Sequence, residues 1–147
     1  MLKNIDPLLS PELLSALRAM GHGDNIAIVD ANFPAETNAR RLIRLDGHSS
    51  LRVLDALLSV MPLDDFEPDA AVRMQVVGDA AAEMPIFGAY RDALKRHDPL
   101  MKGQLGSLER HAFYAAARAA FAIIATGETQ LYGNILLRKG VIRPTVA

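Results

Sequence analysis

Amphipathic helical stripes alternate with short apolar runs along the sequence, and this alternation constrains the fold more than any other feature. Leucines recur at helical spacing between residues 51 and 61, whereas residues 25–30 and 121–126 are short runs rich in Ile, Val and Ala. Helical spacing gives a helix one apolar face, and a short apolar run suits a buried strand. The sequence therefore predicts an α/β layered domain in which helices cover a sheet.

The expected elements follow from these periods and from the Ser, Pro and Gly residues between them. Helices are expected over 11–20, from Ser49 or Ser50 to Met61, over 85–97 and over 109–118; strands are expected near 25–30, 41–45, 71–77, 121–126 and 135–137. Residues 31–38, 63–69 and 98–106 are expected to be loops. Since no internal repeat or linker divides the chain, we expect residues 1–147 to form one domain.

Composition excludes several classes of function. The net charge of −1 offers no bulk attraction to nucleic acid or to an anionic membrane. The absence of cysteine excludes disulfides, thiolate nucleophiles and zinc–thiolate sites. The longest purely apolar stretch, residues 119–125, is too short to cross a bilayer, and the first residues lack the apolar core of a signal peptide. We expect a cytoplasmic protein that binds neither nucleic acid nor membranes.

Two chemically capable side chains stand at opposite ends of one predicted strand. His22 lies between Gly21 and Gly23, and Asp30 follows the apolar run. Loops at strand ends often carry the active sites of α/β proteins. His22 could be a general acid or base, or an exposed loop residue without a role. Asp30 could accept hydrogen bonds from a substrate hydroxyl, or could satisfy N–H groups of its own loop.

Two further groups of residues suit a polar ligand. Arg110 and Tyr114 are large side chains on an alanine-rich helix, and Tyr132-Gly133-Asn134 follows a turn. A hydroxyl and an amide suit a neutral polyhydroxyl ligand, and glycine permits close approach of the backbone. The alternatives are a surface salt bridge for Arg110 and simple turn chemistry for residues 132–134.

Motifs for cofactors and metals are absent from the sequence. It contains no phosphate loop, and Gly21-His22-Gly23 precedes a strand and lacks the third glycine of a dinucleotide fingerprint. No His-x-x-x-His pair or cluster of carboxylates and histidines marks a metal site. We therefore expect neither a cofactor nor a metal.

The motifs together resemble the fucose mutarotase and ribose pyranase family. The matching segments occur in family order over nearly the whole chain: residues 9–14, 20–24, 32–34, 43–44 with 46–47, Arg110 with 113–114, and most of 120–141. Phe33-Pro34 and the Gly-His-Gly-Asp sequence at 21–24 resemble the L-fucose branch of the family.

The resemblance implies a three-layer α/β/α domain with a mixed sheet of about six strands. It also implies a homo-oligomer, such as the ring-forming decamers of the family, with a monosaccharide site at or near a subunit interface. By matching position, the resemblance assigns His22 as the proton donor. The sugar contacts that it assigns are Asp30, Arg110, Tyr132, Gly133 and Asn134.

The function implied by the resemblance is that of an isomerase. An L-fucose mutarotase interconverts the α and β anomers by acid/base ring opening and closure, without cofactor or metal. The alternatives are a D-ribose pyranase, a non-catalytic sugar-binding or transport-accessory protein, and a purely structural ring protein. His111 and residues 98–106 depart from the family pattern and bear on which sugar fits.

Overall fold

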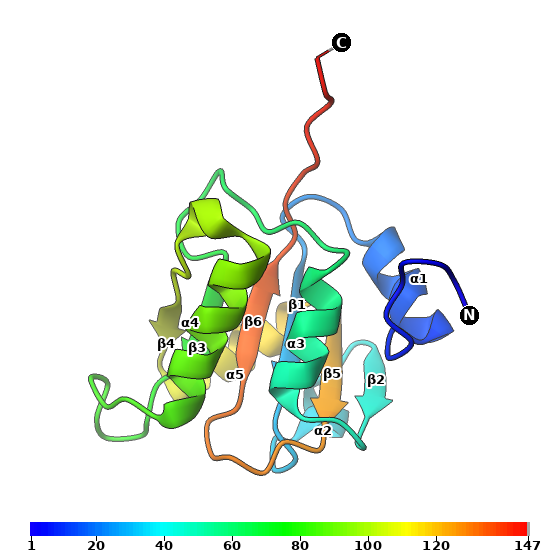
Figure 1. The fold of residues 1–147 in the computed structure, drawn as a ribbon. Coiled ribbons are helices and arrows are strands. Elements are labelled where there is room, and N and C mark those ends of the chain that lie inside the picture. The colour runs from blue at the N-terminus through cyan, green and yellow to red at the C-terminus, as the bar shows by residue number, and fades with distance from the viewer. Residues whose placement is uncertain (147) are drawn as a thin grey trace.

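The computed structural model describes residues 1–146, which contain a six-stranded sheet in the order β2-β5-β1-β6-β3-β4 (Figure 1). The strands are β1 (Asn25–Val29), β2 (Leu42–Leu45), β3 (Ala71–Met74), β4 (Gly106–Leu108), β5 (Ala122–Thr126) and β6 (Ile135–Arg138). Strand β6 runs antiparallel to its neighbours β1 and β3, and the remaining pairs are parallel. The sheet is therefore mixed, as the family resemblance implied.

Helices cover both faces of this sheet. The helices α1 (Pro11–Ala19), α3 (Ser50–Leu58) and α4 (Pro85–His97) pack on one face, and α2 (Ala35–Asn38) and α5 (Arg110–Ala119) pack on the other. This arrangement confirms the predicted three-layer α/β/α fold. No helix within residues 1–146 is long and apolar enough to cross a membrane.

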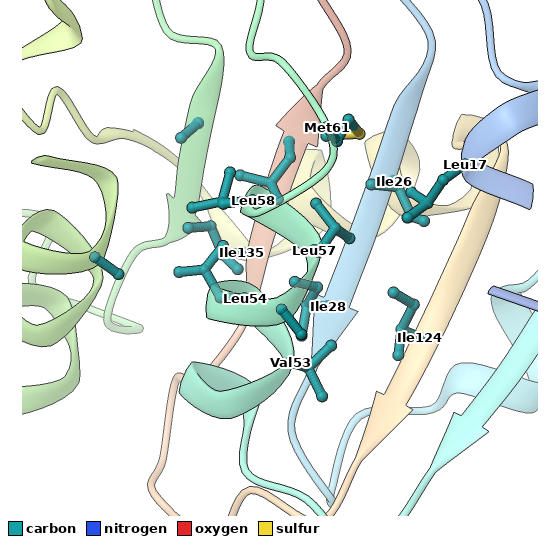
Figure 2. Packing of buried hydrophobic residues seen from close by; sticks show 14 of the residues in the cluster. Leu17, Ile26, Ile28, Val53, Leu54, Leu57, Leu58, Met61, Ile124 and Ile135 are labelled. Atoms are coloured by element: carbon teal, nitrogen blue, oxygen red, sulfur yellow. The ribbon is translucent and has the colours of Figure 1, made fainter. Parts of the chain in front are cut away.

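Strand β1 shows why the central strands are apolar at every position. Ile26 and Ile28 belong to the apolar cluster under α3, whereas Ala27 and Val29 belong to the cluster under α5. Figure 2 shows Val53 and Leu57 of α3 beside Ile28 of β1, and Leu54 beside Ile135 of β6. Successive residues of a strand face opposite sides of the sheet. A strand that is covered on both faces is therefore apolar at every position and shows no alternation of polar and apolar residues.

Side chains at the helix ends explain where two of the helices begin. Ser10 is the N-cap of α1, and its hydroxyl accepts a hydrogen bond from the Leu13 N–H at 3.2 Å. The Glu109 carboxylate caps α5 in the same way, by accepting from the N–H groups of His111 and Ala112. Such caps satisfy N–H groups that lack a partner within the helix.

The structure differs from the expected elements at four places. Residues 31–38 contain the short helix α2, and residues 98–106 contain a 3₁₀ turn, η1 (Pro99–Met101), and the first residue of β4. The expected strand over 71–77 ends at Met74, and the helix expected to reach Met61 ends at Leu58. Strand β4, which pairs with β3, has three residues and is too short to show a period in the sequence.

The strand directions gather functional residues at one edge of the sheet. Strands β1 to β5 all run the same way, so their carboxyl ends meet where β6 begins. Asp30 follows β1 at this edge, Arg110 lies two residues beyond β4, and Asn134 directly precedes β6. His22 precedes β1 and therefore lies at the opposite edge.

Candidate functional site

A pocket of about 250 Å³ with both polar and apolar lining lies at the edge of the sheet where β1, β3 and β4 end. We call it the sheet-edge pocket. Its lining comes from the segments that meet at this edge: Asp30, Asn32, Phe33, Met74, Val77, Arg110, Tyr114, Leu131, Tyr132 and Asn134. Four of the predicted sugar contacts, namely Asp30, Arg110, Tyr132 and Asn134, are thus brought together, although Asp30 and Asn134 are 104 residues apart in the chain.

Asp30 and Asn134 form a reciprocal pair in this pocket. The Asp30 N–H donates to Asn134 Oδ1 at 2.8 Å, and Asn134 Nδ2 donates to Asp30 Oδ2 at 3.0 Å. The Asn32 N–H donates to the other carboxylate oxygen of Asp30 at 2.9 Å. Burial raises the pKa of Asp30, while the bonds from Asn32 and Asn134 act in the opposite direction. Each carboxylate oxygen keeps acceptor capacity for a ligand hydroxyl.

One wall of the pocket is aromatic and cationic. Arg110 Nε donates to the Tyr114 hydroxyl at 3.3 Å, and the guanidinium carbon lies 5.3 Å from the centre of the Tyr114 ring. The Phe33 ring packs edge-on against Tyr114 at 5.1 Å. Arg110 is exposed and lines the pocket, and only Nε of its guanidinium bonds to Tyr114, so its NH₂ groups can donate to a ligand.

Tyr132 and Gly133 lie on a tightly packed turn. Tyr132 has a φ of +62°, an unusual value for a residue with a side chain, and its hydroxyl accepts from the Val77 N–H at 3.1 Å. The phenolic hydrogen of Tyr132 therefore stays available to a ligand. Gly133 lies behind the lining, where a Cβ atom would stand 2.6 Å from Glu128 Cγ. Glycine is required there because the turn packs too closely for any side chain.

His22 does not line the sheet-edge pocket. About 16 Å of extended strand separates Asn25 from Asp30, and His22 lies farther back still. Its loop is ordered: the Gly23 N–H donates to the Lys139 carbonyl at 2.9 Å, and Gly23 has a φ of +87°. The imidazole is 42% exposed and stands 4.9 Å from the Phe66 ring. Within one chain, the predicted proton donor and the predicted sugar contacts form two separate groups.

The buried Asp64 holds His22. Its Oδ1 lies 2.9 Å from His22 Nε2, and its Oδ2 accepts from Arg138 Nε at 2.8 Å. Burial raises the pKa of Asp64, but the hydrogen bonds from His22, the Phe66 N–H and Arg138 outweigh that effect and lower it to about 2. Asp64 is therefore ionised and has no hydrogen to donate, so Nε2 of His22 carries the shared hydrogen. Nδ1 is left as the atom that can exchange a proton with a ligand.

The sequence predicts an acidic loop around Asp64 and indicates no role for this residue. It is 42 residues from His22 along the chain, and no motif spacing links the two residues. The one sequence signal for a buried carboxylate is the position of Asp64 directly after the apolar Met61-Pro62-Leu63.

The site has the chemistry of a binder of small neutral ligands. The sheet-edge pocket offers a carboxylate, an amide, a phenol and one guanidinium beside apolar rings, a combination suited to a molecule with several hydroxyl groups. No group of three or more His, Cys, Asp or Glu side chains in the described part of the chain is arranged to hold a metal ion.

Comparison with known proteins assigns the family. Residues 3–142 match the RbsD / FucU transport protein family, and the chain belongs to it. The fucose mutarotase of Danio rerio is 43% identical over 148 residues, which cover 97% of this chain and 95% of that protein. These findings confirm the resemblance that the sequence motifs indicated.

Solved structures agree with this assignment. The structure of FucU from Bifidobacterium longum has a TM-score of 0.90 at 41% identity and covers 96% of this chain and 100% of that one. The fucose mutarotase of Streptococcus pneumoniae in complex with L-fucose has a TM-score of 0.88 at 42% identity and covers 97% and 100%.

Proposed function

We propose that this chain is an L-fucose mutarotase, an isomerase that interconverts the α and β anomers of the free sugar. The observation that carries the proposal is the sheet-edge pocket, which unites Asp30, Arg110, Tyr132 and Asn134 in a chain 43% identical to a fucose mutarotase. A site for a sugar phosphate would call for several basic groups or a glycine-rich helix start, and the pocket offers one arginine.

The pocket binds the sugar through its hydroxyl groups. Asp30 and Asn134 hold each other by two hydrogen bonds, so their remaining acceptors and donors have fixed directions. Arg110 and Tyr132 donate hydrogen bonds to the ring oxygen and hydroxyl oxygens of the sugar. The aromatic rings of Phe33 and Tyr114 pack against the C–H groups of the sugar. Gly133 contributes backbone close to the pocket. Prior orientation of these groups lowers the entropic cost of binding.

The reaction needs two coordinated proton transfers. Ring opening requires a proton on the ring oxygen and removal of the proton from the anomeric hydroxyl; C1 then rotates, and the ring closes on its other face. The uncatalysed reaction takes roughly hours, which corresponds to a barrier of about 22 kcal/mol. Positioned acid–base catalysis supplies on the order of 10² to 10⁴ in rate. His22 exchanges the proton of the sugar's ring oxygen through Nδ1. Asp64 accepts a hydrogen bond from Nε2 and so keeps the imidazole in place.

The complete site includes residues of two subunits. His22 and the sheet-edge pocket lie at opposite edges of the same sheet. A histidine that acts on the bound sugar must therefore come from another copy of the chain. The exposed fraction of the imidazole, 42%, leaves it open to such a contact. This geometry supports the homo-oligomer that the sequence predicts, and each subunit gives its histidine to one neighbour.

Anomeric exchange measured by saturation-transfer NMR tests the activity. We expect added protein to accelerate exchange of L-fucose more than ring interconversion of D-ribose. His22→Ala should reduce the acceleration at least about 100-fold, because it removes the general acid. His48→Ala, which changes an exposed histidine outside the pocket, is the matched control and should keep full activity. Faster exchange of ribose alone would indicate a pyranase, and an active His22→Ala would contradict the role of His22.

Mixing two inactive variants tests the shared site. His22→Ala supplies an intact pocket, and Asp30→Asn supplies an intact histidine. In mixed oligomers with random assembly, about a quarter of the sites combine the intact halves, so activity should return to that level. Mixtures that stay inactive although the subunits exchange would show that each site is built within one chain.

Three further expectations remain predictions of the sequence: a cytoplasmic location, catalysis without cofactor or metal, and a decameric ring.

A further inference from the structure

A buried carboxylate that does not line the sheet-edge pocket lies directly behind it. Glu128 follows β5 and is 5% exposed. Its Oε2 accepts from the Ser50 N–H at 3.2 Å and from the Ser50 hydroxyl at 3.0 Å, and its Oε1 accepts from the Gln130 N–H at 3.0 Å. These are three hydrogen bonds to one buried carboxylate, which also sits at the positive N-terminal end of α3.

A second helix joins this arrangement through a chain of hydroxyl groups. The Tyr90 hydroxyl of α4 lies 2.7 Å from Ser50 Oγ, and Tyr90 is fully buried. Since the single hydroxyl hydrogen of Ser50 points to Glu128, Tyr90 must be the donor to Ser50. Burial raises the pKa of Tyr90, which keeps this donor protonated. The hydrogen-bond chain thus runs from Tyr90 through Ser50 to Glu128 and ties α4 and α3 to the turn after β5.

Glu128 also contacts both segments that carry the sugar-binding residues. Its carboxylate holds Gln130, and its Cγ lies where a side chain at Gly133 would be, directly under the turn that carries Tyr132 and Asn134. Its backbone carbonyl accepts from the N–H of Ala31, the residue after Asp30, at 2.9 Å. One residue therefore sets the spacing between the Asp30 loop and the 130–134 turn.

We propose that Glu128, supported by Ser50 and Tyr90, is a positioning residue that holds the sheet-edge pocket in its sugar-binding shape. The proposal rests on the function proposed above, and it assigns Glu128 no contact with the sugar. The 130–134 turn carries binding groups, whereas His22 lies at the other edge of the sheet. Loss of the carboxylate therefore weakens sugar binding more than it slows the proton transfers.

Saturation kinetics of the L-fucose anomeric exchange, measured on the intact protein, test the proposal. In Glu128→Gln, the new NH₂ group must face the N–H of either Ser50 or Gln130, so at least one hydrogen bond is lost with little change in volume. We expect KM to rise about tenfold and kcat to stay within about threefold, since the displaced groups bind rather than react. Ser50→Ala removes the hydroxyl between Glu128 and Tyr90 and should raise KM in the same direction.

A destabilised control separates positioning from general loss of structure. Ile43→Val shortens a buried side chain on β2, away from the pocket. It should lower the unfolding midpoint and leave KM unchanged. If Glu128→Gln and Ser50→Ala both keep the KM of an active wild type, Glu128 does not position the pocket. If the wild type itself fails to accelerate the exchange of fucose, the proposed function falls, and the role of Glu128 falls with it.

Discussion

The carboxylate that holds His22 makes a contribution to stability that depends on pH. The pKa of Asp64 falls from its ordinary value of 3.8 to about 2 in the folded chain. A shift of this size corresponds to about 2 kcal/mol of folding free energy. Because the folded-state pKa is the lower one, the contribution is complete above the unfolded pKa. It is lost as the pH falls through the folded value.

Urea unfolding of the wild type and Asp64→Asn, at one protein concentration, measures this contribution. The free-energy difference between them should shrink by about 1 kcal/mol from about pH 5.5 to pH 3, with most of the rest lost by pH 2. Asp65→Asn is the control. It also removes one negative charge, but from the neighbouring residue, which forms an exposed ion pair with Arg143. Its difference from the wild type should vary much less with pH. A difference for Asp64→Asn that stays constant across this range would refute the coupling of Asp64 to His22 and Arg138.

Two further substitutions test the packing by denaturant unfolding. Leu57→Ala removes a fully buried side chain between α3 and the sheet (Figure 2) and should lower the unfolding free energy by about 2 to 5 kcal/mol. A loss below 1 kcal/mol would mean that this layer is not close-packed. Gly133→Ala places a Cβ atom 2.6 Å from Glu128 Cγ and should lower the unfolding free energy by about 1 to 3 kcal/mol. Wild-type stability in that variant would show that the turn is looser than the contact distance indicates.

Local sequence patterns were sufficient to predict most elements of the fold. The capping serine before α1, the leucine stripe of α3 and the apolar runs of β1 and β5 are signals carried by a few neighbouring residues, and each element forms close to where it was predicted. The three-residue strand β4 and the four-residue helix α2 were missed. Elements this short complete barely one repeat of their period, and tertiary contacts decide whether they form.

The candidate residues were also named from the sequence, because unusual groups in glycine-flanked loops stand out and their order matches a known family. Their grouping depended on the tertiary structure. The direction of β1 places Asp30 beside Asn134 and leaves His22 at the other edge, next to a carboxylate 42 residues away. The buried network of Glu128, Ser50 and Tyr90 likewise joins three elements that no local pattern connects. The sequence by itself determined which side chains are available for chemistry, because identity and local period are properties of short segments. Only the tertiary structure decided which of them meet, because hydrogen bonds and burial depend on distances between segments remote in the chain.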